Sequence, residues 1–165
     1  MFVGAFERQL DERGRVALPS AFREGIGTDP YLAFGADGCV QVLSTEQFRS
    51  DADELVAGVK TGSVSRQRAR AFAASAMRVK VDKQGRVTLE SRLRDHAGLQ
   101  PQSPVVVLGS LDRVELWEPT RYEHETEAGT GEFAAAGTAS AATDPTDRTD
   151  TSDTSTSDAS EMEPA

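Results

Sequence analysis

The chain has 165 residues, of which 38% are hydrophobic, a formal net charge of −9 and a single cysteine, Cys39. This length allows one compact domain or two very small ones, and a lone cysteine excludes an intramolecular disulfide, as is usual in a reducing compartment. The apolar stretches, such as residues 105–108, are no longer than a strand, and the first residues lack a basic segment followed by an apolar run, so we expect a cytoplasmic protein without signal peptide or membrane partner.

Two stretches of the sequence are copies of one another. Residues 11–18, DERGRVAL, return as residues 82–89, DKQGRVTL, and the match continues on both sides of a three-residue insertion near residues 100–103. Each copy has short apolar runs separated by turns rich in Gly, Asp and Pro, a pattern typical of strands and hairpins. We therefore predict two tandem β-repeats, over residues 1–48 and 76–124.

A helical connector is predicted between the repeats, over residues 49–75. Ser44 and Gln47 have the spacing of a capping box, in which each side chain bonds a backbone amide of the first turn. Apolar residues then follow at helical spacing, with a break at residues 58–62 before a second amphipathic stretch. Because a repeat of about 45 residues could hardly bury a sufficient core alone, we expect the copies to complete one shared barrel. The predicted fold is mainly β with short helices, in the α+β class.

The acidic residues are concentrated at the C-terminal end. Residues 1–124 hold 17 Lys or Arg and 17 Asp or Glu, whereas residues 125–165 hold one basic residue, Arg148, and ten acidic ones, which accounts for the whole charge of −9. Residues 143–160 contain no aliphatic side chain larger than alanine, so burial cannot offset the entropy of ordering them. We predict a disordered acidic tail from residue 125. Because the rest of the chain is neutral, any nucleic-acid site must be a local concentration of Arg and Lys.

The motif Asp-x-x-Gly-Arg-Val occurs once in each copy and carries the candidate site. Its Asp and Gly are typical of a turn, in which the carboxylate caps the backbone and the glycine takes a positive φ. No turn type requires an arginine after its glycine, and a guanidinium on a tight turn can bind a guanine edge or a phosphate. Structural pairing of these arginines with the aspartates of the turns is the alternative. The turn-forming candidates are Asp11, Gly14, Asp82 and Gly85, and the DNA-binding candidates are Arg15, Arg86, Arg13, Lys83, Arg78 and Lys80.

With these residues the chain resembles the MraZ family, bacterial regulators associated with division and cell-wall genes, in the SpoVT-AbrB-like group. The resemblance rests on residues 2–8, 11–19 and 81–87. It implies two swapped-hairpin halves in a pseudo-symmetric barrel, and a ring-shaped homo-oligomer that binds direct repeats in double-stranded DNA upstream of its own operon, on the nucleoid. By the same resemblance, Arg15 and Arg86 contact the DNA. No cofactor or small-molecule substrate is implied.

Three other functions compete with DNA binding as interpretations of this sequence. Duplicated Asp-x-x-Gly turns suggest an aspartic protease, but those enzymes have Asp-Thr/Ser-Gly, and cationic neighbours would lower carboxylate pKa values that a shared proton needs raised. A metal site has little support, because Cys39, His96 and His124 are isolated in the sequence, with His96 expected at the surface or capping a helix. The main alternative is a protein-interaction module, antitoxin-like or a scaffold, with DNA binding secondary. We predict a DNA-binding regulator that is no enzyme.

Overall fold

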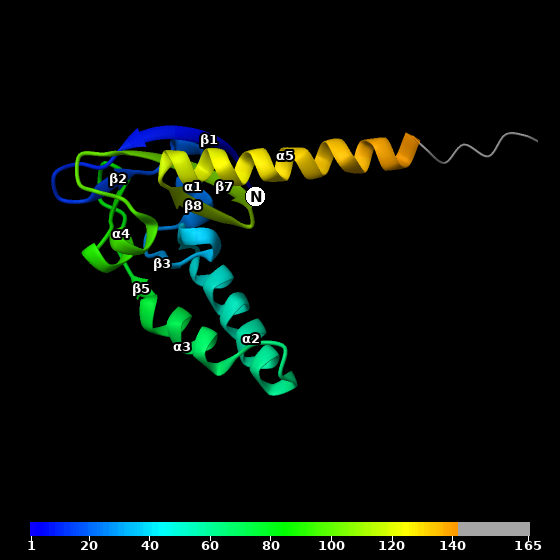
Figure 1. Cartoon of the computed structure of the whole chain (residues 1–165). Helices are drawn as coiled ribbons and strands as arrows, with labels where there is room; N and C mark the ends of the chain where they lie inside the picture. Colours follow the sequence, from blue (N-terminus) through cyan, green and yellow to red (C-terminus); the bar gives the residue numbers. More distant parts are fainter. Residues whose placement is uncertain (142–165) are drawn as a thin grey trace, which may run out of the picture. The chain divides into compact units, whose positions relative to one another are not determined.

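Six antiparallel strands form the main sheet of the computed structural model, which describes residues 1–141, with side chains up to residue 136 (Figure 1). Their order is β1-β7-β8-β4-β3-β5, and β2 and β6 form a second, two-stranded antiparallel sheet. The strands are β1 (Phe2–Gln9), β2 (Arg15–Ala17), β3 (Tyr31–Phe34), β4 (Val40–Leu43), β5 (Met77–Arg78), β6 (Arg86–Thr88), β7 (Pro104–Leu111) and β8 (Arg113–Trp117). The helices are α1 (Ser20–Ile26), α2 (Thr45–Thr61), α3 (Arg66–Ser75), α4 (Ser91–Ala97) and α5 (Pro119–Ala141), with a single 3-10 turn at Ala36–Gly38.

The main sheet is open. β1 and β5 lie at its two edges, and within residues 1–141 no strand pairing joins them. The predicted closed barrel is therefore wrong, because β2 and β6 pair with each other outside the main sheet and leave its two edges unjoined. The α+β class is confirmed, but the helices hold more residues than the strands, so the fold is not mainly β.

The two copies of the repeat are interleaved. β1 of the first copy pairs along its whole length with β7 of the second, and β5 of the second copy pairs with β3 of the first. Past the end of β5, the amides of Val79 and Val81 still donate to carbonyls of the segment before β3, at 2.9 Å. Side chains alternate along this stretch, because Met77, Val79 and Val81 pack against the core while Arg78 and Lys80 are exposed.

One hydrophobic core takes side chains from both copies. Val16 and Val87 lie opposite each other where β2 pairs with β6, and neither is exposed. The buried residues of this core are Phe2, Leu10, Val16, Leu18, Phe22, Ile26, Leu32, Val40, Val42, Val87, Leu89, Leu93, Ala97, Leu99, Val105, Val107, Val114 and Leu116. Since both copies supply them, neither copy could keep this core without the other.

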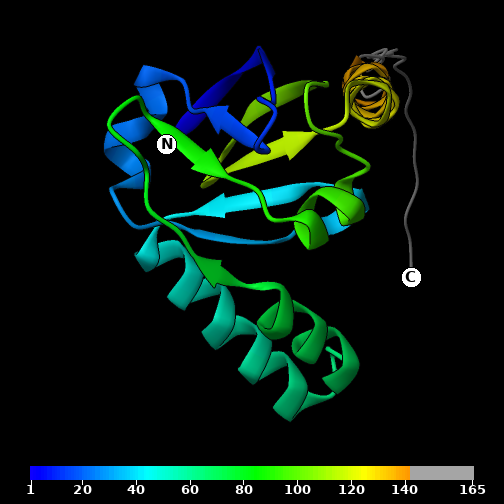
Figure 2. The ribbon, with the colours of Figure 1, turned by 90° about the vertical axis from the view of Figure 1, so that its left-hand side faces the viewer.

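The connector is a pair of contacting helices, α2 and α3 (Figure 2). Ser44 caps α2 by accepting a hydrogen bond from the amide of Gln47 at 3.1 Å, as predicted. The reciprocal half of the capping box is wrong, because the Gln47 side chain donates to Asp51 instead, at 2.7 Å. α2 also continues through Gly58 and ends only at Gly62, whose φ of 80° closes the helix.

The C-terminal helix α5 corrects the predicted tail. The stretch from residue 125 to Ala141 is helical: its six alanines and three glutamates favour a helix without burial, although three glycines and three threonines do not. The rest of the predicted tail lies outside the described residues. The chain divides into a unit spanning Met1–Gly129 and a second beginning at Thr130. No helix within residues 1–141 is both long and apolar enough to cross a membrane.

Candidate nucleic-acid interface

The two copies of the motif form the same turn. Asp11 Oδ1 accepts hydrogen bonds from the backbone amides of Arg13 and Arg15, each at 2.9 Å. The second turn repeats both bonds at 2.9 Å, with Asp82 Oδ1 accepting from the amides two and four residues further on. The glycines of the turns, Gly14 and Gly85, have φ values of 72° and 77°, a left-handed conformation that favours glycine.

The arginine after each glycine is tied to the aspartate of its own turn. Arg15 Nε lies 2.6 Å from Asp11 Oδ2, and Arg86 Nε lies 2.8 Å from Asp82 Oδ2. Arg86 Nη1 also lies 3.7 Å from Asp11 Oδ2, so the two turns share one carboxylate. The structural pairing considered as an alternative is therefore present. It occupies the Nε edge of each guanidinium, while about a quarter of each arginine side chain stays exposed.

Hydrogen bonding lowers the pKa of both turn aspartates. For Asp11 the largest cause is the bond from the Arg15 amide, and for Asp82 it is the bond from the Arg86 amide. Desolvation is the second-largest cause and raises the pKa, and the hydrogen bonds from the arginine side chains come next and lower it. Both carboxylates are therefore ionised near neutral pH, and each turn arginine is held in place by a charged partner.

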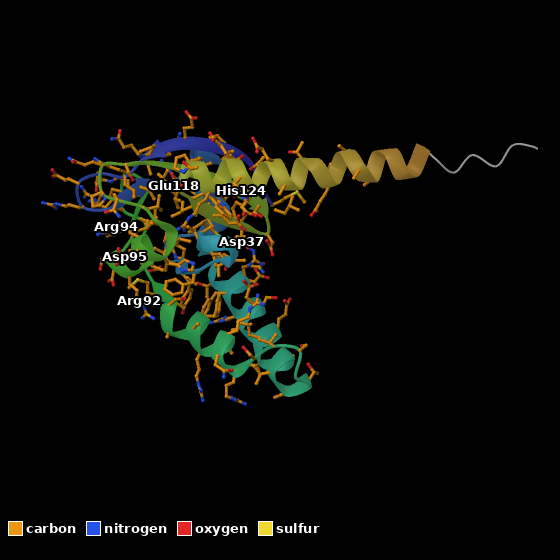
Figure 3. All side chains as sticks on the ribbon, in the orientation of Figure 1. Asp37, Arg92, Arg94, Asp95, Glu118 and His124 are labelled. Carbon is orange, nitrogen blue, oxygen red and sulfur yellow. The ribbon has the colours of Figure 1, made fainter. Side chains whose placement is uncertain are left out.

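Each turn is supported by an arginine from the other copy. Arg94 of α4 donates to the Leu89 carbonyl at 2.5 Å, and a Cβ atom on Gly14 would lie only 2.6 Å from its Nη1 (Figure 3). Arg23 of α1 is placed in the same way against Gly85 and donates to the Leu18 carbonyl at 3.0 Å. Arg23 and Arg94 occupy matching positions in the two copies, but no pattern in the sequence predicted this role.

Backbone bonds then join the two turns. The amide of Leu18 donates to the carbonyl of Gly85 at 2.9 Å, and the amide of Leu89 donates to that of Gly14 at 2.8 Å. Between these bonds, β2 and β6 pair with Val16 opposite Val87 (Figure 2). The structure thus brings the two copies of the motif together, although they lie 71 residues apart in the sequence.

The other predicted DNA-binding residues are exposed cations. Arg13 and Lys83 lie within the turns, and Arg78 and Lys80 lie on the strand-like approach to the second turn. Among residues 1–136, none of these four side chains forms an ion pair. Their charges are therefore available to a ligand, in contrast to the paired charges of the arginines after the glycines.

The candidates for other chemistry are separated or sequestered. Burial raises the pKa of the Cys39 thiol to about 12, so it stays protonated. His96 was expected at the surface or as a helix cap, but it is half-buried and its ring contacts other residues. Its ring stacks on Phe34 with centroids 4.0 Å apart, and its Nε2 lies 3.1 Å from the carbonyl of Gly35. Among the described side chains, no three His, Cys, Asp or Glu residues group as metal ligands.

Comparison with known proteins identifies the family. The family model described as "MraZ protein, putative antitoxin-like" matches residues 1–68 and 72–142. A protein named transcriptional regulator MraZ from Natranaerobius thermophilus is 34% identical over 133 residues, which cover 81% of this chain and 92% of that protein. A protein of the same name from Salinispora tropica is 37% identical over 134 residues, or 81% and 93% of the two chains. Both copies of the motif lie inside the residues that the family model matches, and the chain belongs to the MraZ family.

Proposed function

We propose that the chain is a sequence-specific DNA-binding transcriptional regulator and that the paired turns are its DNA-reading element. The observation that carries the proposal is the pairing of β2 with β6, which presents two turns of the same geometry side by side. The names of the relatives support a role in transcription. A protein that binds its own promoter in this way would be found in the cytoplasm, on the nucleoid.

The geometry of the turns suits contacts with DNA. Asp11 and Asp82 hold the Nε edges of the arginines, so each guanidinium is oriented before DNA arrives and loses little entropy on binding. Its remaining N–H groups could then bind a guanine edge, for which arginine has the matching donor geometry. The exposed ammonium of Lys83 and guanidinium of Arg13 would contact phosphates, which fix position without reading sequence.

The proposal includes an assembly. Residues 1–124 carry no net charge, so one copy of the protein should bind DNA weakly. A ring of copies joined head to tail would multiply these contacts at high effective concentration. Such an arrangement fits direct repeats upstream of the protein's own operon, as a two-fold dimer fits a palindrome. Within each copy, the exchange of β1 and β5 between the repeats agrees with two swapped-hairpin halves.

Fluorescence anisotropy tests the proposal. The full chain is titrated against its own upstream DNA and against a scrambled duplex of equal length, with Arg15→Ala and Arg86→Ala in parallel. We expect tight binding only to the upstream duplex and its loss in both variants. Because both arginines also bond within their turns, unfolding by urea is measured for each variant. Equal binding to both duplexes by the native chain would contradict the proposal.

A protein partner is the second candidate, because the matching family is described as antitoxin-like. On this alternative, the chain would bind a second protein as its main role and DNA only secondarily. Purification of the full chain from its own cells distinguishes the two functions. A different protein recovered in a fixed ratio, together with no discrimination between the duplexes, would favour the partner-binding role.

A further inference from the structure

The longest stretch of the chain without an acidic residue lies immediately before the second turn. Residues 55–81 hold six basic residues and no Asp or Glu. By contrast, the first turn, residues 11–15, has two residues of each sign, and the second, residues 82–86, has a net charge of only +1. The largest local excess of positive charge is therefore outside the turns. The six basic residues are Lys60, Arg66, Arg68, Arg70, Arg78 and Lys80.

Two of these arginines lie together on α3. Arg66 and Arg70 are four residues apart, on one face of the helix, and both are exposed. In the part of the chain whose side chains the structure describes, neither forms an ion pair. Arg66 also begins α3, where the helix dipole disfavours a cation, and the first turn of the helix holds no acidic residue. Their placement therefore does not serve the stability of the helix, which points to an external anion.

Further cations continue from α3 toward the turns. Arg92 of α4 donates to the carbonyl of Ala74, in the last turn of α3, at 2.9 Å (Figure 3). Arg78 and Lys80 follow α3 and point away from the core, because the residues that alternate with them, Met77, Val79 and Val81, pack against it. We call Arg66, Arg70, Arg92, Arg78 and Lys80 the basic strip.

The length of the basic strip is comparable to a turn of DNA. A helix rises about 1.5 Å and an extended chain about 3.3 Å per residue, so the chain from Arg66 to Lys83 spans at most roughly 40 Å. A turn of the double helix is roughly 35 Å long. At that upper limit the strip, which begins beside the second turn, would reach about one turn of DNA beyond the site that the turns contact.

We propose that the basic strip is a second DNA contact, which binds the phosphate backbone flanking the sequence read by the turns. This inference rests on the proposed function. Phosphodiester oxygens are the matching ligands, because an arginine can bind two of them at once and such contacts carry no sequence information. Continuity with Lys83 favours DNA over other anionic occupants, such as acidic residues of a second copy or of the chain's own C-terminal region.

The test compares the full chain with its Arg66→Gln/Arg70→Gln variant, which removes two charges and keeps good helix-forming residues. Arg49→Gln is the control, since Arg49 is an exposed cation on α2 outside the strip. Anisotropy is measured over a salt series on two duplexes that contain the upstream sequence. One ends at the direct repeats, and the other extends a full helical turn beyond them on each side. A scrambled duplex of the longer length completes the set.

At low salt, we expect the double variant to bind both longer duplexes, upstream and scrambled, about tenfold more weakly than the native chain. The slope of log affinity against log salt should be shallower by roughly 1.8, as for two lost phosphate contacts. Binding to the short duplex should stay as in the native chain, and Arg49→Gln should have less effect than the double variant. Unchanged affinity and slope on the longer duplexes would overturn the inference.

Other outcomes identify a different occupant and also overturn it. Tighter DNA binding by the double variant would show that the strip holds an acidic segment of the chain. A fall in the assembled mass, measured by light scattering, would show that it contacts a second copy. If the native chain fails to distinguish upstream from scrambled DNA, the proposed function itself is contradicted. If it does distinguish them and the salt slope of the double variant is unchanged, only the inference about the basic strip is contradicted.

Discussion

The guanidinium of Arg23 lies against Gly85 in the turn of the other copy, in the space that a Cβ atom on Gly85 would occupy. Arg94 stands in the same relation to Gly14. Each copy therefore supplies the support for the other copy's turn, and the candidate DNA-reading element cannot be assembled from one repeat alone.

Gly85→Ala should destabilise the protein by about 2–4 kcal/mol, because it adds a displaced Arg23 to the strain of a positive φ. Gly62→Ala is the matched control: its φ of 80° and ψ of 4° are left-handed, but no atom lies within 4 Å of the added carbon. The control should therefore lose only about 1–2 kcal/mol. Urea unfolding measures both, and equal losses would show that Arg23 does not restrict the site.

The free energy of unfolding should fall in acid because of the turn aspartates. In the folded protein, Asp11 and Asp82 have pKa values below their ordinary value of 3.8. Their contribution to the free energy of unfolding is therefore complete above pH 3.8, and it is lost as the pH falls through the pKa of the folded state. The variant Asp11→Asn/Asp82→Asn should have a lower free energy of unfolding than the native chain at neutral pH. Below about pH 4, its free energy of unfolding should fall less on acidification. Urea unfolding at a series of pH values tests this, and parallel curves for both proteins would contradict it.

Asp51→Asn should destabilise the attachment of α2 to β8. Asp51 lies 3.0 Å from Arg113 Nη1, with only 11% of its side chain exposed, and the Arg113 pKa is raised by Asp112 and then by Asp51. Loss of this charge should cost about 1–2 kcal/mol, because Arg113 keeps Asp112 as a partner. Asp53→Asn, at an exposed position of the same helix, should change the unfolding free energy by less than about 0.5 kcal/mol. Similar losses of unfolding free energy in the two variants would show that the ion pair between Asp51 and Arg113 does not stabilise the protein.

Cys39 should resist thiol reagents in the native protein. Only 1% of the residue is exposed, and burial followed by the nearby charge of Glu115 raises its pKa to about 12. At pH 8 an aromatic disulfide reagent should leave the native chain unmodified and react quickly once urea unfolds it. Rapid modification without urea would show that the region around β4 opens readily.

The sequence predicted much of the candidate site because the repeat marks it twice. The match of residues 11–18 with residues 82–89 located both turns and the aspartate, glycine and arginine positions within them. The sequence did not predict that the turns meet, because the pairing of β2 with β6 depends on backbone hydrogen bonds between residues far apart in the chain.

The errors have physical causes. The barrel was inferred from the need for a shared core, and a core enclosed between an open sheet and the β2–β6 pair meets the same need. The tail was judged by its lack of apolar residues, although alanine and glutamate can form a helix up to Ala141 without burial. The roles of Arg23 and Arg94 depend on a turn contributed by the other copy, which no local pattern encodes.

The most direct test of the paired turns uses their exposed cations, which can be removed without breaking a contact among the described side chains. Anisotropy with the upstream duplex is measured for Arg13→Ala/Lys83→Ala and for the control Arg49→Ala, with urea unfolding of each. If the turns read DNA, the double variant should bind at least about tenfold more weakly while its unfolding free energy stays that of the native chain. Binding as tight as that of the native chain would contradict the account and place the DNA site elsewhere on the protein.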